Sequence, residues 1–218
     1  MFQNKYMLLD LLEILFPSEC ANCGYIGRAL CDRCLDTLIY EPHTREIEDL
    51  KVCIAMYYDP DSILEKLILP FKYNHQKDIF RLFVPHMNRA LQLLYFPEEI
   101  LLIPVPLHKN RELERGYNQA EVLANYLGKK NGINVVNLIE RVKNTEKQSL
   151  TKSRSEREKN MEDAFKIVGK VSKHGHLVLV DDIVTTGSTL LACMKVLQDA
   201  GYEKISALTL AERESFRH

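Results

Sequence analysis

Apolar residues occur along the chain in two patterns, short runs that are mostly apolar and runs with helical spacing. The short runs predict buried strands over residues 52–58, 100–105, 133–138, 177–181 and 205–211. Apolar residues three and four positions apart predict amphipathic helices over residues 6–16, 61–71, 79–94, 112–130 and 188–200. Pro85 lies inside the third of these helices and is a candidate for a kink or break. Because strands alternate with helices, we expect an α/β fold with a parallel sheet that binds ligands at the carboxyl ends of its strands.

Polar stretches separate these elements. Residues 41–50 (EPHTREIEDL) predict a linker. Residues 141–160 contain seven Lys or Arg against three Glu, a composition that indicates a mobile charged segment. We therefore expect two units: an N-terminal helix with a small cysteine-rich module over residues 1–45, and an α/β domain over residues 46–218.

Residues 177–189, LVLVDDIVTTGST, carry the most specific chemistry of the chain. A buried strand ends at two carboxylates, Asp181 and Asp182, and a tight turn then leads into a helix. Backbone N–H groups at a helix N-terminus attract an anion, and hydroxyl groups add donors. The two carboxylates can accept hydrogen bonds from vicinal ribose hydroxyls or hold a hydrated Mg²⁺. The candidate phosphate-binding residues are Thr185, Thr186, Gly187, Ser188 and Thr189.

Helix capping and a nucleotide-binding loop are two other interpretations of this run. Helix capping alone would explain Thr185, Thr186 or Ser188, but it does not explain paired aspartates followed by Thr-Thr-Gly. A Walker A loop would also bind phosphate, but its pattern G-x-x-x-x-G-K-[ST] occurs nowhere in the sequence. We therefore favour a sugar-phosphate site.

Four cysteines form two C-x-x-C pairs that are separated by seven residues. Two such pairs can present four thiolates tetrahedrally, which suits a closed structural Zn²⁺ site. A disulfide is disfavoured in a reducing compartment, and a redox C-x-x-C would not need a second pair. We expect zinc to stabilise a segment too small to fold alone. The predicted ligands are Cys20, Cys23, Cys31 and Cys34.

Two further segments carry candidate cations for a pyrophosphate group. The first, IPVPLHKNRELERGYNQAEVLA over residues 103–124, leaves a strand and crosses a loop with Arg111 and Arg115, which can bind phosphate oxygens bidentately. The second is the basic segment from residue 141, which could close over the site, neutralise the leaving group and exclude water. A solvated charged face explains the first equally simply, and a disordered loop or a nucleic-acid arm explains the second.

Composition sets outer limits on these interpretations. The chain has 218 residues and a net charge of -1, so any contact with DNA or RNA needs a local patch or a partner. No apolar run is long enough to span a membrane, and residues 6–17 lack the flanks of a signal peptide. Cys53 and Cys193 lie outside the clustered cysteines, a usage that fits the reducing cytosol. We therefore expect a cytoplasmic protein.

Seven motifs in a fixed order resemble one known family. They are LLEILFPSECANCG, LILPFKY, IPVPLHKNRELERGYNQAEVLA, T-x-x-Q-x-L (145–150), R-x-x-N (157–160), Ala164–Phe165 and LVLVDDIVTTGST. Together they resemble the ComF/ComFC family, also described as a double zinc ribbon and as amidophosphoribosyltransferase-like. The resemblance covers nearly the whole chain. It implies a four-cysteine zinc module ahead of a type I phosphoribosyltransferase fold, whose sugar-phosphate donor is phosphoribosyl pyrophosphate (PRPP).

The resemblance also implies roles for single residues. The 5′-phosphate of PRPP would lie on residues 185–189, and Asp181 and Asp182 would face the ribose hydroxyls directly or through Mg²⁺. Since adjacent strand residues point to opposite faces, one of the two would contact the sugar. The implied pyrophosphate contacts are Arg111 and Arg115, with Lys147, Arg154 and Arg157 on the closing loop. The residues expected to shape the pyrophosphate loop are Gly116, Tyr117, Asn118 and Gln119; Asn118 fits a helix N-terminus equally well.

Two functions follow. The first is an enzyme that transfers phosphoribose from PRPP, with Mg²⁺, to an acceptor that the sequence does not identify. The second is a non-catalytic module of DNA uptake in which the phosphate site holds single-stranded DNA or a regulatory nucleotide. The resemblance implies a link to natural transformation, beside a ComFA-type helicase in the cytoplasm.

Overall fold

The computed structural model describes residues 19–20, 22–28, 30–38, 40–58, 62–71, 80–94, 99–143, 164–172 and 175–213. The helix expected over residues 6–16 lies outside these ranges, as does most of the charged segment that begins at residue 141.

Six strands form the main sheet. Their spatial order is β1 (His43–Ile47), β2 (Leu50–Tyr58), β8 (Ile205–Arg213), β7 (His176–Val184), β3 (Ile100–Pro104) and β4 (Asn134–Val135). All neighbouring pairs are parallel except β1 with β2, which is antiparallel. The predicted parallel sheet is therefore confirmed. The predicted linker over residues 41–50 is wrong, because β1 forms there and pairs with β2 as an edge strand. Strand β1 also spans residue 45, where we expected the cysteine-rich module to end. The division into two units stays a prediction.

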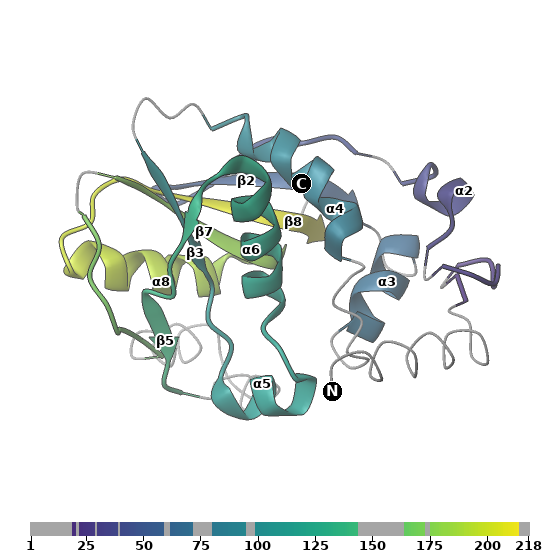
Figure 1. The fold of residues 1–218 in the computed structure, drawn as a ribbon. Coiled ribbons are helices and arrows are strands. Elements are labelled where there is room, and N and C mark those ends of the chain that lie inside the picture. The colour runs from purple at the N-terminus through teal and green to yellow at the C-terminus, as the bar shows by residue number, and fades with distance from the viewer. Residues whose placement is uncertain are drawn as a thin grey trace.

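Helices cover both faces of this sheet. On one face lie α4 (Phe80–Leu91) and α6 (Gln119–Asn131), and on the other lies α8 (Ser188–Asp199) (Figure 1). A hairpin of β5 (Ile139–Arg141) and β6 (Phe165–Ile167) packs on the α8 side. The shorter helices are α2 (Asp32–Leu35), α3 (Ile63–Phe71) and α5 (Lys109–Arg115).

The apolar run of β7 fills both layers of the core. Val178 and Val180 pack in the cluster that contains the α4 and α6 side chains, whereas Leu177 and Leu179 pack in the cluster that contains those of α8. All four are fully buried. A strand with helices on both faces has no solvent-facing side, which explains why its sequence is continuously apolar.

The helix predicted over residues 112–130 is wrong in one respect, because it is divided. Gly116 ends α5 with a φ of +77°, a left-handed conformation that glycine adopts without a steric cost. Asn118 then begins α6, and its side chain accepts a hydrogen bond from the N–H of Ala120 at 3.0 Å. The strand predicted over residues 133–138 is also shorter than expected: β4 holds two residues, and β5 belongs to the separate hairpin. By contrast, α4 continues through Pro85.

The order of the strands places two loops side by side. The chain leaves β3 toward α6 and β4 on one side, and it leaves β7 toward α8 and β8 on the other. Because β3 and β7 are parallel neighbours, the loops that follow them diverge from one edge of the sheet, and ligands of open α/β sheets bind in such a crevice. In the part of the chain that the structure describes, no helix combines the length and the apolar character needed to cross a membrane.

The cysteine-rich segment packs against the α4 side of the domain. Cys20, Leu30 and Cys34 belong to the same buried cluster as Phe80 of α4. The ring of Tyr40 stacks on that of His86 with centroids 3.3 Å apart. Burial and the nearby charge of Arg89 lower the pKa of His86 to about 4, and its buried Nδ1 has no hydrogen-bond partner among the residues that the structure describes.

His86 should make the stability of the fold depend on pH. Below pH about 6.5 the unfolded chain protonates this histidine whereas the folded protein does not, so stability falls as the pH drops from 7.5 toward 4. We expect His86→Phe, which keeps an aromatic ring against Tyr40, to reduce the loss of stability between pH 7.5 and pH 5.5 by about 0.5–1 kcal/mol, after a discount for partial exposure. Urea unfolding of both proteins at the two pH values measures this, and an identical loss in the variant would contradict it.

Candidate functional site

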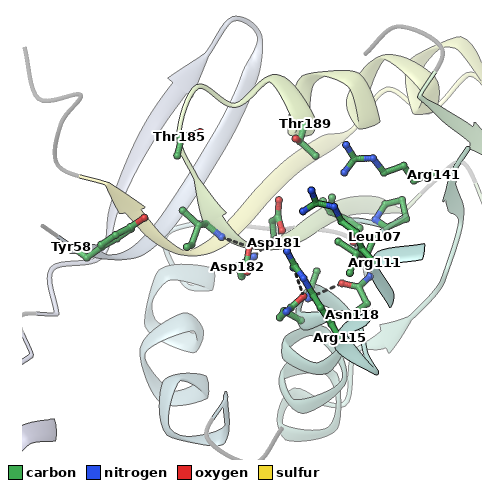
Figure 2. Close-up of a pocket in the computed structure, with 15 residues that line it drawn as sticks. Tyr58, Leu107, Arg111, Arg115, Asn118, Arg141, Asp181, Asp182, Thr185 and Thr189 are labelled. Atoms are coloured by element: carbon green, nitrogen blue, oxygen red, sulfur yellow. Dashed lines mark hydrogen bonds between the residues drawn. The ribbon is translucent and has the colours of Figure 1, made fainter. Parts of the chain in front are cut away.

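A cavity of about 470 Å³ opens where β3 and β7 end. It is lined by residues of both loops, of α6 and of the hairpin (Figure 2). The lining residues are Tyr58, Val105, Pro106, Leu107, Arg111, Arg115, Asn118, Gln119, Ala120, Arg141, Asp181, Asp182, Ile183, Thr185 and Thr189.

The loop between β7 and α8 presents backbone donors. The N-cap of α8 is Gly187, with a φ of +80° and no side chain that could cap the helix. The N–H of Ser188 donates to Oγ1 of Thr186 at 3.5 Å. The hydroxyl groups of Thr186 and Ser188 lie 3.2 Å apart. Thr185 and Thr189 line the cavity at the two ends of the loop. A glycine N-cap at a helix N-terminus, flanked by hydroxyl groups, has the features of an anion-binding turn.

Asp181 and Asp182 lie within β7, since that strand continues to Val184. We expected them at its end, and the ladder with β8 extends further than the apolar run suggested. The two carboxylates act on groups in opposite layers of the fold. Burial raises the pKa of Cys193 in α8, and the charge of Asp181 raises it further. On the α6 side, burial raises the pKa of Tyr117, and the charge of Asp182 raises it further. Both carboxylates line the cavity.

Each carboxylate is oriented by the backbone that follows it. An Oδ1 atom of Asp181 accepts the N–H of Asp182 at 2.9 Å, and Oδ1 of Asp182 accepts the N–H of Ile183 at 2.7 Å. These bonds reduce the freedom of both side chains before any ligand arrives. Fixed carboxylate oxygens suit ribose hydroxyl groups or a hydrated Mg²⁺.

Arg111 and Arg115 both line the cavity from α5. Arg115 is only 9% exposed, and its Nη1 donates to Oε1 of Gln119 at 3.2 Å. The other cation of that helix is used differently: Lys109 forms an ion pair with Glu140 of β5 at 2.7 Å and does not line the cavity.

The four residues after Arg115 have separate roles. Gly116 ends α5, and the buried ring of Tyr117 packs edge-to-face on Phe80 in the core. Asn118 caps α6 and donates to the carbonyl of Val105 at 2.9 Å, so it joins α6 to the end of β3 while lining the cavity. Gln119 is buried against Arg115. These contacts fix the shape of the loop after β3.

Arg141 is a lining residue that the sequence did not single out. It is 6% exposed, its Nε donates to the carbonyl of Lys143, and its guanidinium lies 5.5 Å from the ring centroid of Phe165. Figure 2 places it beside Thr189. A signal existed, because Arg141 follows Ile139 by two positions and therefore shares the buried face of a strand, where arginine is rare. Tyr58, at the end of β2, was also missed.

Three predicted site residues lie outside the described residues: Lys147, Arg154 and Arg157. Their part in the site stays a prediction.

The four predicted zinc ligands converge. The Sγ atoms of Cys20, Cys23, Cys31 and Cys34 all lie within 4.8 Å of one another, and those of Cys23 and Cys31 are 3.7 Å apart. Tetrahedral Zn²⁺ with Zn–S bonds of about 2.3 Å needs sulfur atoms about 3.8 Å apart. The cluster therefore could hold a metal such as zinc with little rearrangement.

The electrostatics of the cluster also favour a cation. Burial raises the pKa of Cys20, but backbone N–H groups, led by that of Cys31, outweigh burial and lower the pKa to about 6. The amide of Asn22 lowers the pKa of Cys34, but burial and the neighbouring thiols raise it to about 11. Thiolates this close repel one another, and a divalent cation would remove that repulsion.

The chain is similar to known proteins in sequence and in structure. The chain matches the family described as Phosphoribosyl transferase domain over residues 113–217. Among solved structures, a hypoxanthine phosphoribosyltransferase from Staphylococcus aureus aligns with a TM-score of 0.40 and 13% identity, covering 69% of this chain and 73% of that one.

The relatives by sequence match most of the chain. Competence protein F of Haemophilus influenzae is 38% identical, over 90% of this chain and 85% of that protein. Competence protein ComFC of Bacillus subtilis is 30% identical, over 94% and 82% respectively. Competence protein ComFC of Streptococcus pneumoniae is 34% identical, over 91% and 82%. The chain is an α/β protein with a type I phosphoribosyltransferase fold and a four-cysteine cluster near its N-terminus. It therefore belongs to the ComF/ComFC family.

Proposed function

We propose that the protein binds PRPP with Mg²⁺ and transfers phosphoribose to an acceptor with release of pyrophosphate. One observation carries this proposal: a single cavity joins an anion-binding turn, two fixed carboxylates and three arginines. Figure 2 shows Asp181 and Asp182 in one cavity with Thr185, Thr189, Arg111 and Arg115. PRPP carries groups of matching chemistry: a phosphate, a ribose diol and a pyrophosphate.

Each part of the cavity would bind one part of this donor. The N–H groups and hydroxyls of residues 185–189 would hold the 5′-phosphate. Asp181 and Asp182 would accept hydrogen bonds from the ribose hydroxyls or ligate Mg²⁺, which would neutralise part of the pyrophosphate charge. Arg111 and Arg115 would bind the pyrophosphate oxygens, and Arg141 adds a third, buried cation.

The reaction needs charge stabilisation more than acid–base chemistry. The acceptor would attack C1 of the ribose while the bond from C1 to the pyrophosphate oxygen breaks, and its electron pair would leave with pyrophosphate. Negative charge therefore grows on the leaving group beside the arginines, where pre-oriented donors lower the barrier. In this proposal Lys147, Arg154 and Arg157 belong to a loop that closes over the site and excludes water.

We further propose that the four cysteines bind Zn²⁺ and that zinc has a structural role. All four ligands are thiols, and three of them are buried in the same cluster as α4, so a zinc ion would have no open position for a substrate.

The names of the relatives support a biological setting. Proteins named for competence and, in Escherichia coli, for DNA utilization match most of this chain. We propose that the protein acts in the cytoplasm in the uptake or use of DNA, beside a ComFA-type helicase.

The same names favour a second candidate function. The relatives are named for competence and not for an enzymatic reaction. The cavity could then bind the phosphates of single-stranded DNA without catalysis, since arginines and backbone N–H groups hold a DNA phosphate as well as a free one.

The donor site can be tested by calorimetry. We expect PRPP to bind in the presence of Mg²⁺ and to bind much more weakly after chelation by EDTA. Asp181→Asn/Asp182→Asn should reduce pyrophosphate release in an acceptor screen by about a hundredfold or more, because the ribose and Mg²⁺ contacts are lost. Asp199→Asn, an exposed carboxylate at the end of α8, is the matched control. If the wild-type protein bound no PRPP with Mg²⁺, the first candidate would be rejected.

The metal site can be tested by elemental analysis. The purified protein should contain about one zinc ion per chain, and Cys23→Ser should lose most of it because four thiolates are needed for a closed site. The same variant should unfold at a lower temperature. Cys53→Ala removes a buried cysteine outside the cluster and should keep the zinc. Equal zinc content in all three proteins would contradict the assignment.

The two candidate functions make different predictions about DNA. If the cavity binds DNA, a labelled oligothymidylate should bind more weakly as salt rises, PRPP with Mg²⁺ should displace it, and Arg111→Glu should weaken it about tenfold or more. Arg89→Glu, on the exposed side of α4, is the control for charge. Fluorescence anisotropy measures all three. DNA binding that neither PRPP nor Arg111→Glu affects would exclude the cavity as the DNA site.

A further inference from the structure

The edge strand β1 lies against the turn that forms one wall of the cavity. Nη1 of Arg45 lies 3.5 Å from the carbonyl oxygen of Thr185, within hydrogen-bond distance. The same nitrogen forms an ion pair with Glu212 near the end of β8. Arg45 therefore connects two segments that are 140 and 167 residues away in the sequence.

The carboxylate that holds Arg45 is itself fixed. Glu212 is only 5% exposed and pairs with Val184, the last residue of β7 before the turn. Nε2 of His43 lies 3.3 Å from its second oxygen, and the His43 ring stacks on Tyr57 with centroids 3.8 Å apart. Burial raises the pKa of Glu212, but hydrogen bonds from His43 and Arg45 outweigh burial and lower the pKa. Glu212 is therefore a charged anchor for the guanidinium.

A bond to the Thr185 carbonyl orients the next N–H group as well. The peptide between Thr185 and Thr186 is planar and trans, so its C=O and N–H point in opposite directions. When Arg45 holds the carbonyl on the β1 side, the N–H of Thr186 is directed to the other side. A donor fixed in advance costs no reorganisation when an anion binds.

A second residue of β1 fixes the next part of the turn. Ile47 lies two positions after Arg45, on the same face of the strand. It is buried, and a Cβ added to Gly187 would lie 2.5 Å from its Cδ1 atom. Only glycine combines this contact with a φ of +80°. The turn is therefore held by β1 at Thr185 and again at Gly187.

We propose that Arg45 is a positioning residue, which holds the turn of residues 185–189 in the conformation that binds the ligand's phosphate. The identity of that ligand as PRPP rests on the proposed function, but the effect on the turn does not. The cysteine cluster ends only nine residues before β1, so the strand that follows the cysteine module also forms part of the phosphate site.

The experiment compares the wild-type protein with three arginine variants. Arg45→Met removes the contact, Arg45→Lys keeps a cation, and Arg28→Met removes an arginine from an exposed ion pair with Asp32 as the matched control. Because Arg45→Met leaves a buried carboxylate with one fewer partner, the double variant Arg45→Met/Glu212→Gln secures a folded protein. Backbone order parameters of Thr186 and Gly187 are measured by NMR without ligand, and PRPP affinity is measured by calorimetry with Mg²⁺.

We expect order parameters of about 0.85 for the turn of the wild-type protein. In Arg45→Met and in the double variant, the order parameters of the turn should fall below about 0.6. PRPP should bind those two about tenfold more weakly, with Arg45→Lys between them and wild type and Arg28→Met unchanged. An equally rigid turn in Arg45→Met would overturn the proposal, and so would a more mobile turn with unchanged PRPP affinity. A wild-type protein that binds no PRPP would refute the donor assignment, while the order parameters would still decide the role of Arg45.

Discussion

The parallel pairing of β3 with β7 is the constraint on which the candidate site depends. Pro104 pairs with Val180 at the carboxyl end of β3, and the N–H of Val105 donates to the Val180 carbonyl at 2.9 Å. The two chain segments then diverge, one into α5 and one into the turn before α8. Side chains more than 60 residues apart therefore face one cavity, because backbone hydrogen bonds hold the two strand ends in register.

Burial on both sides of the sheet makes this arrangement rigid. The alternating residues of β7 fill two separate apolar layers, and the next two residues, Asp181 and Asp182, continue the same alternation as carboxylates. Charged groups at the edge of such a core cannot move far, since the strand that carries them is packed on both faces. The same packing gives the site fixed donors and acceptors, which is what binding of a multiply charged sugar phosphate requires.

The elements that the sequence predicted well are those whose pattern is local. The run that became β2 is apolar from residue 52 to 58, that of β7 is apolar from 177 to 180, and β8 is apolar at five of the seven positions 205–211. Helix α8 has apolar positions at helical spacing. The errors arose where tertiary contacts decide. Residues 43–47 look like a polar linker, because only three side chains of an edge strand face the protein, yet β1 pairs with β2 and supports the phosphate turn. The break at Gly116 divides a helix that its apolar periodicity alone would have continued.

For the site, the sequence by itself determined the chemical groups: two adjacent aspartates, the Thr-Thr-Gly turn, the arginines of the loop after β3, and four cysteines with metal-ligand spacing. Those motifs are contiguous, so their chemistry can be read without knowing the fold. Only the tertiary structure decided which cations share the cavity, since Arg141 enters it from the hairpin whereas Lys109 turns away to Glu140. It also decided the role of Arg45, because that contact joins residues distant in sequence that only the pairing of strands brings within hydrogen-bond distance.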